Sequence, residues 1–400
     1  MANKTVLGMV FHGEYPTHPR IENQALHLIN LGMEVHLFCV TYKKNEPRHQ
    51  LYKGIHVHRH YLPSWMYQLS ALAYSISLYH LIMKPKLGSF VRDNKIDVLH
   101  LHNMYLAQPL FDLNKKNKLP IVLDLHENLP EIMKHYPHLK SALGKVLIHP
   151  SFWKKKEEEF IKKSDKVIVV TNEAKIDIES RTKIDSDKTL VLPNFTDSSF
   201  IKKSYDQNIA NRFADRFNVL YIGDTGTRRG LESVIRSIPL LIHDIPNFNL
   251  IIVGSSSNDA SLKELANKEG ATKYVSAEGW QTENLLPDYV HVADVGICPI
   301  LRNIHHDTTY ANKLFQYALH GKSILASDCI AQKSLIENEE WGLIHSADDA
   351  VDFAKQLKTL YHNPELRKKT GQNAAKSIEN KYNYGSSGFN NKFYTKLLNG

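Results

Sequence analysis

The feature that most constrains the fold is an alternation of short apolar runs with segments of helical periodicity, which occurs twice along the chain. The first series starts at Val6–Phe11 and the second at 219–223, with a polar stretch at 196–211 between them. Apolar strands joined by helices form parallel sheets, because each crossover must return the chain to the edge from which it started. The sequence therefore predicts an α/β fold with two doubly wound, Rossmann-like domains.

This repetition also sets the expected domain boundaries, since 400 residues are too many for one core. We expect an N-terminal domain at 1–195, a C-terminal domain at 196–378, and a tail at 379–400 that packs back on the first domain. Ligands bind outside the carboxyl ends of such strands, so the domains are expected to face each other across a cleft. Strands are expected at 6–11, 34–40, 55–60, 98–102, 121–125 and 167–170, and then at 219–223, 250–254, 274–279, 294–299 and 324–327.

Charge and cysteine content exclude several classes of protein. The formal charge is +8 and the pI is near 9.0, but the basic residues are dispersed along the chain. This dispersal argues against nucleic-acid binding and suits anionic substrates or an anionic membrane surface. Cys39, Cys298 and Cys329 are lone cysteines, so neither a disulfide framework nor a zinc cluster is expected. Because the first apolar run is also too short for a signal peptide, we expect a cytoplasmic location.

One segment, 61–83, contains no Asp, Glu, Lys or Arg. A continuous helix of this length would be long enough to cross a bilayer, but polar residues interrupt the segment. An amphipathic helix fits better, with an apolar stripe formed by Trp65, Leu69, Leu72, Ile76, Tyr79 and Met83. Two roles stay open for this helix, namely packing in the core and contact with a membrane surface or a lipid acceptor.

A second segment, 308–328, has the pattern of an anion site. Apolar residues recur at helical spacing from Leu314 to Leu319, Gly321 follows where the helix would end, and 324–327 has the composition of a buried strand. The first turn of this helix offers free backbone N–H groups and Lys313, which together suit an anion. An ordinary surface helix would show the same pattern, so this segment alone does not distinguish an anion site from a surface helix.

Several motifs together resemble the retaining glycosyltransferases of the GT-B fold, in family 4. Along the chain they are YPTHPR (15–20), GMEV (32–35), IDVLHLH (96–102), LDLHE (123–127), VLPN (191–194), YIG (221–223) with RRGL (228–231), ADVG (293–296) and NKLFQY (312–317). The resemblance implies transfer of a sugar, with retention, to a glycan or lipid-linked acceptor in cell-surface polysaccharide assembly. The implied donor is a nucleotide diphosphate sugar, a UDP-sugar in the first place and a GDP-sugar as the alternative. No further cofactor is expected.

The resemblance also implies donor-side residues in the second half. Negative charge grows on the departing diphosphate during glycosyl transfer, so cations and helix N-termini are needed there. The basic residue that follows the first strand of the second domain corresponds to Arg228 or Arg229, and the lysine of the later helix corresponds to Lys313. Asn312 directly precedes this lysine and is counted with the donor-binding residues.

The chain departs from the family at two donor positions. Relatives commonly carry two glutamates, the second of which binds the donor ribose, but this chain has Thr308 and Gln316 there. Gln316 can hydrogen-bond ribose hydroxyls without bringing charge, so the choice of base and sugar stays open. Asp307 lies beside the first position and is a candidate to replace that glutamate. Trp280 is expected either to stack on the nucleotide base or to belong to the core.

In the first half, the family places a histidine beside the donor sugar, which corresponds to His126. Such a histidine would donate to a sugar hydroxyl or support positive charge at the anomeric carbon, and the alternative is a structural histidine. His12, Glu14 and Arg20 resemble acceptor-side residues, although a helix-surface charge is the alternative for Arg20. Gly13 would let the backbone approach the diphosphate. The resemblance implies that the leaving phosphate accepts the acceptor's proton, so no dedicated general base is expected.

Two groups of histidines are candidates for metal ligands. His56, His58 and His60 alternate along one strand, which places three imidazoles on one face. No carboxylate or cysteine lies at ligand spacing around them, so we expect no metal site there, nor at 305–307.

Two alternatives to glycosyl transfer share the expected fold. One is a nucleotide-sugar epimerase, which would convert the donor without an acceptor. The other is a catalytically degenerate, nucleotide-binding partner subunit, motivated by Thr308 and Gln316.

Overall fold

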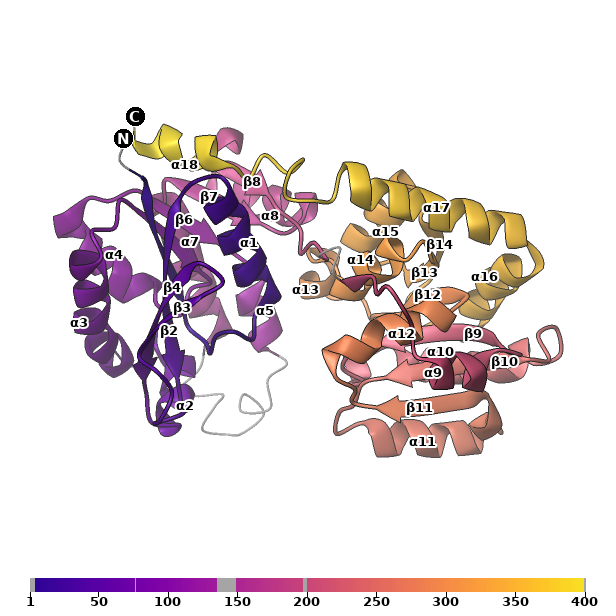
Figure 1. Ribbon diagram of the computed structural model, residues 1–400. Coiled ribbons are helices and arrows are strands. Elements are labelled where there is room, and N and C mark those ends of the chain that lie inside the picture. Colours follow the sequence, from indigo (N-terminus) through magenta and orange to yellow (C-terminus); the bar gives the residue numbers. More distant parts are fainter. Residues whose placement is uncertain (1–3, 76, 135–148, 197–199, 399–400) are drawn as a thin grey trace. The chain divides into compact units, whose positions relative to one another are not determined.

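The computed structural model describes residues 4–75, 77–134, 149–196 and 200–398. The chain forms two compact units (Figure 1), of which the first comprises Met1–Pro193 with Tyr384–Gly400 and the second comprises Asn194–Asn383. The divisions fall at 193 and 383, compared with the expected 195 and 378. The first unit is therefore discontinuous, because the end of the chain returns to it.

An eight-stranded sheet forms the centre of the first unit, in the order β3-β4-β2-β1-β5-β6-β7-β8. Its strands are β1 (Val6–Phe11), β2 (Glu34–Thr41), β3 (His49–Tyr52), β4 (Ile55–Tyr61), β5 (Val98–His102), β6 (Ile121–Asp124), β7 (Lys166–Val169) and β8 (Thr189–Val191). All neighbours pair in parallel except β3 and β4, which are antiparallel. The expected parallel sheet is thus extended at one edge by β3, a strand that the sequence pattern does not predict.

Helices cover both faces of this sheet. They are α1 (Pro19–Asn30), α2 (Trp65–Ala71), α3 (Leu78–Asp93), α4 (Ala107–Asn117), α5 (Leu129–Met133), α7 (Pro150–Lys163), α8 (Asn172–Thr182) and α18 (Asn391–Leu398). The C-terminal segment lies on the same face as α1, because His27 Nε2 is 2.7 Å from the Phe389 carbonyl and the Tyr394 hydroxyl is 2.9 Å from His100 Nδ1. On the other face, α3, α4 and α7 pack apolar side chains against Phe38 and Leu101.

The segment 61–83 differs from the expected single amphipathic helix. It contains α2 and the start of α3, which are separate helices. Tyr79 and Met83 are fully buried whereas Trp65 is 55% exposed, so the apolar stripe divides between the core and the surface. Ile76, which belongs to the expected stripe, lies outside the described residues. Among the helices of the described residues, none has both the length and the hydropathy to cross a bilayer.

The second unit is built on a six-stranded parallel sheet in the order β11-β10-β9-β12-β13-β14. Its strands are β9 (Phe217–Ile222), β10 (Phe248–Val253), β11 (Val275–Gly279), β12 (Val295–Cys298), β13 (Ser323–Ser327) and β14 (Gly342–His345). Five of these strands were expected within about two residues of their observed ends, which is the usual precision of such boundaries. The edge strand β14 was not expected.

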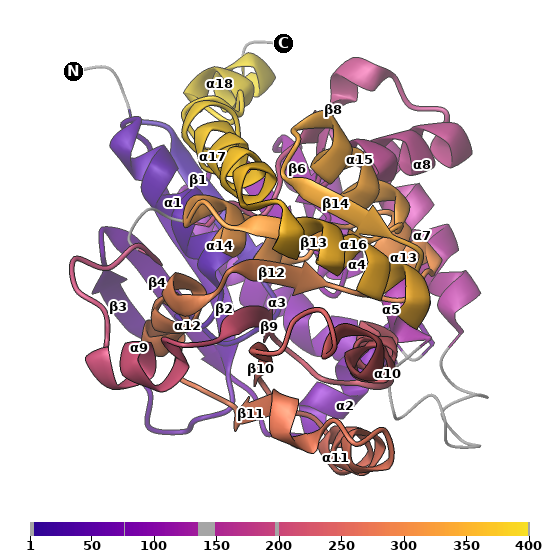
Figure 2. The ribbon, with the colours of Figure 1, turned by 90° about the vertical axis from the view of Figure 1, so that its right-hand side faces the viewer.

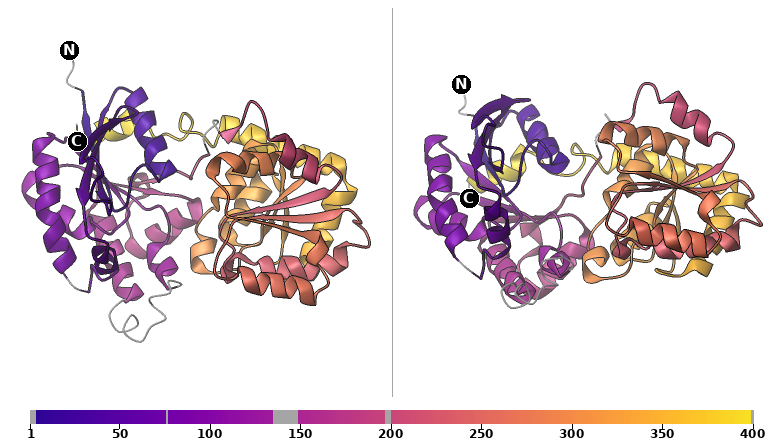
Figure 3. Two further views of the ribbon diagram at one scale, coloured as in Figure 1. Left: turned by 60° about the horizontal axis from the view of Figure 1, so that its bottom comes forward. Right: turned by 90° about the horizontal axis from the view of Figure 1, so that it is seen from below.

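Each face of the second sheet carries its own hydrophobic core, and helices lie on both sides (Figures 2 and 3). One face packs against α10 (Leu231–Leu241), α11 (Asp259–Lys268) and α16 (Ala350–His362). The other packs against α9 (Gln207–Phe213), α12 (Leu286–Val292), α14 (Asn312–Leu319), α15 (Ile330–Asn338) and α17 (Pro364–Asn380). A sheet buried on both faces explains why the strands of this unit are almost continuously apolar.

Candidate active site

The loop that follows β9 is held in a fixed shape by glycines. Gly223 ends the strand with φ of 121°, and Gly230 precedes α10 with φ of 73°, both in the region that favours glycine. A Cβ on Gly230 would lie only 1.9 Å from the Pro299 carbonyl oxygen, so no other residue fits beside the end of β12. The loop 223–230 is therefore positioned at the carboxyl edge of the sheet, where ligands bind in doubly wound folds.

Both predicted arginines lie in this loop, on a short 3-10 turn (Thr227–Arg229). Arg229 Nε donates to Asp224 Oδ2 at 3.1 Å, which orients its guanidinium within the loop. Burial by itself would raise the pKa of Asp224, but the Gly226 N–H and the Arg229 guanidinium hold that pKa below its ordinary value. The Arg228 carbonyl accepts from the Leu301 N–H at 3.0 Å, so the backbone of the turn is tied to the neighbouring strand end.

Lys313 lies in the first turn of α14 and is only 8% exposed. Its Nζ is 3.4 Å from the centre of the Tyr221 ring on β9, and the Cβ position of Gly223 would be 3.6 Å from the same atom. No carboxylate among the described residues forms an ion pair with this amine, and burial lowers its pKa to about 7. The structure thus brings Lys313, the start of α14 and the loop 223–230 together. A buried amine beside the backbone N–H groups of a helix N-terminus is an arrangement that can bind an anion.

The position of α14 depends on one aromatic residue. The Tyr317 hydroxyl donates to the Leu220 carbonyl at 3.0 Å and accepts from the Ile222 N–H at 3.1 Å. Gly296 on β12 leaves room for the Tyr317 ring, since a Cβ there would lie 2.3 Å from a ring carbon. This contact fixes the helix against β9 and so places Lys313 one turn away.

The two positions at which glutamates are expected have different surroundings. The Thr308 hydroxyl donates to the Ile304 carbonyl at 2.8 Å, within the backbone of its own turn. Asp307 accepts from Arg302 Nε and from the Ile330 N–H, each at 3.0 Å, and therefore anchors the start of α15. This engagement argues against the expectation that Asp307 replaces the first glutamate. Gln316 is half-buried and lies one helical turn after Lys313.

The other donor-side candidates are accessible. Trp280 follows β11 and is 71% exposed, so the core alternative for this residue is wrong. Asn312 is exposed at the start of α14. Stacking of Trp280 on a base stays a prediction.

In the first unit, a buried charged network lies at the carboxyl ends of β5 and β6. Asp124 is fully buried and receives a two-pronged contact from Arg20, with Nη2 2.7 Å from Oδ1 and Nε 3.1 Å from Oδ2. Gln24 Nε2 donates to the same carboxylate at 2.8 Å. Burial alone would raise the pKa of Asp124, but Arg20 and the neighbouring histidines hold it well below its ordinary value. The surface-charge alternative for Arg20 is therefore wrong, and its role toward an acceptor stays a prediction.

His126 is attached to this network. Its Nε2 is 3.0 Å from His102 Nδ1 and 3.5 Å from Asp124 Oδ2, and the ring is almost completely buried. Burial lowers the pKa of His126, which the Asp124 carboxylate offsets only in part. A neutral imidazole oriented in this way suits hydrogen bonding to a sugar hydroxyl.

The residues after β1 line the same edge of the sheet. The His12 ring stacks on Tyr105 at 4.8 Å, and burial lowers the pKa of His12 to about 4. A Cβ on Gly13 would lie 2.4 Å from the Phe11 ring, so packing against this ring requires a glycine here whether or not a diphosphate binds. Glu14 Oε1 accepts from the Tyr42 N–H at 3.4 Å. Within the described part of the chain, His12 Nε2 is buried without a hydrogen-bond partner, and a ligand could satisfy it.

Asp124 and His102 are not among the site residues that the sequence predicts. They are direct neighbours in the parallel register of β5 and β6, at the ends of both strands. A polar residue at the end of each of two buried strands was the available signal, because the carboxyl ends of parallel strands meet at one edge.

Comparison with known proteins identifies the family. A model described as Glycosyltransferase Family 4 matches residues 20–200, and one described as Glycosyl transferases group 1 matches residues 216–363. Together they match well over half of the chain. The chain belongs to the family 4, group 1 glycosyltransferases. The first match thus spans most of the unit that contains His126, and the second includes the loop 223–230 and Lys313.

Individual members of the glycosyltransferase family are distant relatives of the chain. Putative glycosyltransferase EpsD of Bacillus subtilis (strain 168) is 26% identical over 163 residues, which are 41% of this chain and 41% of EpsD. The chain spans less than two thirds of the length of the first curated relatives that it matches.

Solved structures show the fold. Sucrose-phosphate synthase from Thermosynechococcus elongatus superimposes with a TM-score of 0.77 at 15% identity, over 99% of this chain and 100% of that one. Anabaena Alr3699/HepE in complex with UDP superimposes with a TM-score of 0.71 at 13% identity, over 99% and 100% of the two chains. The two Rossmann-like units are thus those of the GT-B fold.

Proposed function

We propose that this protein is a retaining glycosyltransferase whose second unit binds a nucleotide diphosphate sugar. The observation that carries the proposal is the buried Lys313 amine at the start of α14, 3.4 Å from the Tyr221 ring and beside the arginine loop. A diphosphate would supply negative charge for this amine, which forms no ion pair with a carboxylate of residues 4–75, 77–134, 149–196 and 200–398, and the helix N-terminus favours an anion further. UDP is the proposed nucleotide, because Anabaena HepE, which has the same fold, is solved with UDP.

The chemistry assigned to these residues is charge neutralisation. The bond between the anomeric carbon and the β-phosphate oxygen breaks, and a bond from the acceptor oxygen to that carbon forms on the same face of the sugar. Lys313 and Arg228 or Arg229 would stabilise the charge on the departing diphosphate. The phosphate oxygen would take the acceptor's proton, so no dedicated base is proposed. Because the lysine and arginine charges would neutralise the diphosphate, no metal ion is proposed at this site.

On the first unit, the proposed role is acceptor binding, with His126 assigned to the donor sugar. His12, Glu14 and Arg20 lie around the carboxyl edge of this unit's sheet, and Arg20 holds Asp124 in place. We propose a glycan or lipid-linked acceptor of cell-surface polysaccharide assembly. The epimerase and partner-subunit alternatives are not favoured, since both family models describe transferases.

A peripheral membrane contact is also proposed, for the surface of α2 and the start of α3. Large apolar side chains are exposed there, at Trp65, Tyr67, Leu78 and Leu81. Two lysines, Lys84 and Lys86, follow in α3 and supply positive charge for anionic lipid headgroups.

A nucleotide screen by thermal unfolding tests the donor proposal. Ligands that bind only the folded state raise the unfolding temperature by mass action. We expect UDP to raise it more than GDP, ADP or CMP do. If no nucleoside diphosphate shifts the transition, the assignment of the second unit as a donor-binding domain is wrong.

A further inference from the structure

Four histidines and a glutamate gather at one edge of the first unit, away from the candidate active site. In the parallel register of β2 and β4, His36 lies opposite His56, and in the antiparallel register of β3 and β4, His49 lies opposite His58. Glu34 begins β2 two residues before His36, so both side chains point to the same face. The sheet therefore assembles five potential ligands from three strands.

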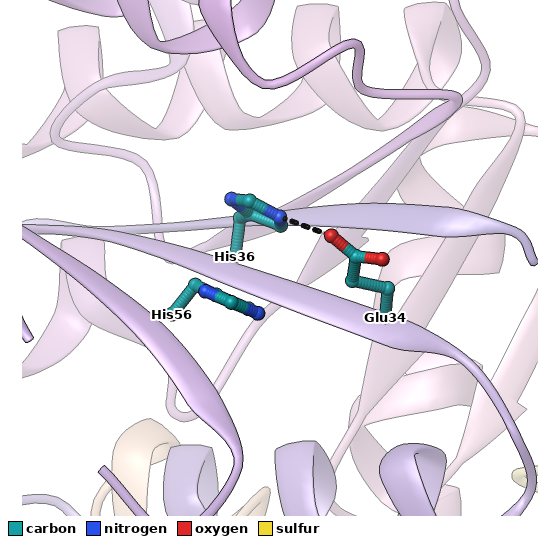
Figure 4. A group of neighbouring side chains, drawn as sticks. All are labelled: Glu34, His36 and His56. Carbon is teal, nitrogen blue, oxygen red and sulfur yellow. Dashed lines mark hydrogen bonds and ion pairs between the residues drawn. The ribbon is translucent and has the colours of Figure 1, made fainter. Parts of the chain in front are cut away.

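Three of these side chains converge on one point (Figure 4). His36 Nε2 is 2.9 Å from Glu34 Oε1, and the His36 and His56 rings are parallel with centroids 4.6 Å apart. One ligand atom from each of Glu34, His36 and His56 lies within 4.8 Å of the other two. The sequence expectation that no carboxylate accompanies these histidines is thus wrong, because Glu34 comes from the neighbouring strand.

Burial in the cluster is graded in a way that suits a metal site. His36 is buried, Glu34 is partly exposed and His56 is exposed. A tetrahedral ion with bonds of about 2.1 Å needs ligand atoms about 3.4 Å apart. The two more exposed side chains can reach this spacing by rotation about their own bonds, while His36 stays in the sheet. Solvent access through His56 provides an entry path for the ion.

We propose that Glu34, His36 and His56 bind a divalent transition-metal ion of the zinc class. Two imidazoles and one carboxylate are donors that zinc prefers, and water would complete a tetrahedral set. The site would link β2 to β4 through their side chains.

The remaining histidines would orient the buried ligand. His36 Nδ1 is 3.0 Å from His58 Nε2, and His58 Nδ1 is 3.0 Å from His49 Nδ1. When an ion takes the lone pair of His36 Nε2, the ring proton must be on Nδ1, from which it donates to His58. His58 then donates through its own Nδ1 to His49, so both hydrogen bonds in this series of three histidines have one donor and one acceptor. Such outer contacts fix the tautomer of a ligating histidine.

A second set of potential ligands, His100, His102 and Asp124, does not offer the same chemistry. Arg20 Nη2 already lies 2.7 Å from Asp124 Oδ1 and supplies the positive charge there.

The zinc-class site lies at the amino ends of β2 and β4, whereas the candidate active-site residues of this unit follow the carboxyl ends of β1 and β6. Metal binding should therefore leave nucleotide binding unchanged.

The test is zinc binding by the metal-stripped full-length chain, measured by equilibrium dialysis against Zn²⁺ with metal analysis. The variants are Glu34→Gln and His56→Gln, which change exposed or partly exposed side chains. His243→Gln is the matched control, because that ring is 97% exposed and lies outside the cluster. The control is needed because the chain contains 22 histidines that can bind zinc weakly.

The wild type and His243→Gln should bind one equivalent at least about 10-fold more tightly than Glu34→Gln and His56→Gln do. When Co²⁺ replaces Zn²⁺, only the wild type and His243→Gln should show the visible absorption of a tetrahedral site. Equal zinc affinity in all four folded proteins, as judged by circular dichroism, would overturn the proposal. Loss in His243→Gln as well would show adventitious binding and would overturn it too.

Discussion

At the scale of single residues, the candidate donor site depends on a buried amine that forms no ion pair with a carboxylate in the described part of the chain. Burial lowers the pKa of Lys313 to about 7, so the free protein near neutrality carries a mixture of the charged and neutral forms. A diphosphate next to this amine would favour the charged form and raise its pKa. Binding and protonation are therefore coupled at this position.

The affinity for UDP should consequently depend on pH above neutrality. Below pH 7 the amine is already charged, but above pH 7 binding requires uptake of a proton, which costs about tenfold in affinity per pH unit. Calorimetric titrations between pH 7 and 9, in buffers with different ionisation enthalpies, would show both the slope and the proton uptake. A flat profile over this range would contradict the lowered pKa of Lys313, and Lys313→Met should remove the dependence.

Asp124 illustrates the opposite arrangement, a buried carboxylate whose charge is matched. Asp124→Asn would remove the carboxylate charge that faces the buried guanidinium of Arg20, so the free energy of unfolding at pH 7 should fall by about 3 kcal/mol. Asp112→Asn is the control, because Asp112 pairs with the largely exposed Lys115 and should lose at most about 1 kcal/mol. Urea unfolding measures both. Equal losses would mean that the Arg20–Asp124 pair contributes no more than a surface pair.

At the scale of elements, α14 is located by the contact of Tyr317 with β9 and β12. The apolar spacing of its sequence predicts the helix and its end near Gly321. In the structure the helix ends at Leu319, His320 caps it, and Gly321 follows with φ of 64°. The contact between the Tyr317 ring and Gly296 could not be predicted from the sequence, because it depends on which strand packs against the helix. The residues around Lys313 therefore predict an anion site at the start of α14, but the position of this helix depends on Gly296 of another element, β12.

Gly296→Ala should disturb this element as a unit. The added Cβ would lie 2.3 Å from the Tyr317 ring, and overpacking of this kind costs about 2 kcal/mol. UDP binding should also weaken, since Lys313 is carried by the same helix. Gly88→Ala is the control, because its Cβ meets only Leu113 at 3.5 Å and should not destabilise α3. Chemical unfolding and UDP titration of both variants test this, and unchanged UDP affinity in Gly296→Ala would contradict the coupling.

Short edge strands and the 61–83 segment show where sequence patterns fail. The residues of β3 are mostly exposed, so no apolar run marks this strand. In β14, Gly342 packs so closely on β13 that a Cβ would lie 1.8 Å from the Ile324 carbonyl oxygen, a requirement that only the folded sheet reveals. Between α2 and α3 the helical spacing continues in the sequence although the helix does not.

The apolar surface of α2 and α3 leads to a membrane prediction. Trp65→Ser combined with Leu81→Ser should reduce co-flotation with anionic vesicles several-fold, because less apolar area would enter the headgroup region. Ile176→Ser, on α8, is the control, since Ile176 is equally apolar and 66% exposed. Indistinguishable flotation of the wild type and the double variant would reject this surface as a membrane contact.

At the scale of the whole molecule, the repeated strand–helix pattern predicted two Rossmann-like units, and both were found. The motifs placed Lys313 and the two arginines at the carboxyl edge of one sheet, and His126 at that of the other. They did not show that Arg20 is buried against Asp124, since that contact joins residues 104 positions apart. Long-range pairings of this kind depend on the three-dimensional arrangement of the strands and helices, which local periodicity does not contain.

The second unit is proposed to recognise a diphosphate through Lys313. Calorimetric titration of UDP and uridine into the wild type, Lys313→Ala and Lys333→Ala at pH 7 tests this proposal. Lys333 is a half-exposed lysine of α15 and serves as the matched control. We expect the wild type and Lys333→Ala to bind UDP far more tightly than uridine, and Lys313→Ala to lose at least about tenfold in UDP affinity. Equal UDP affinity in all three proteins would contradict the claim.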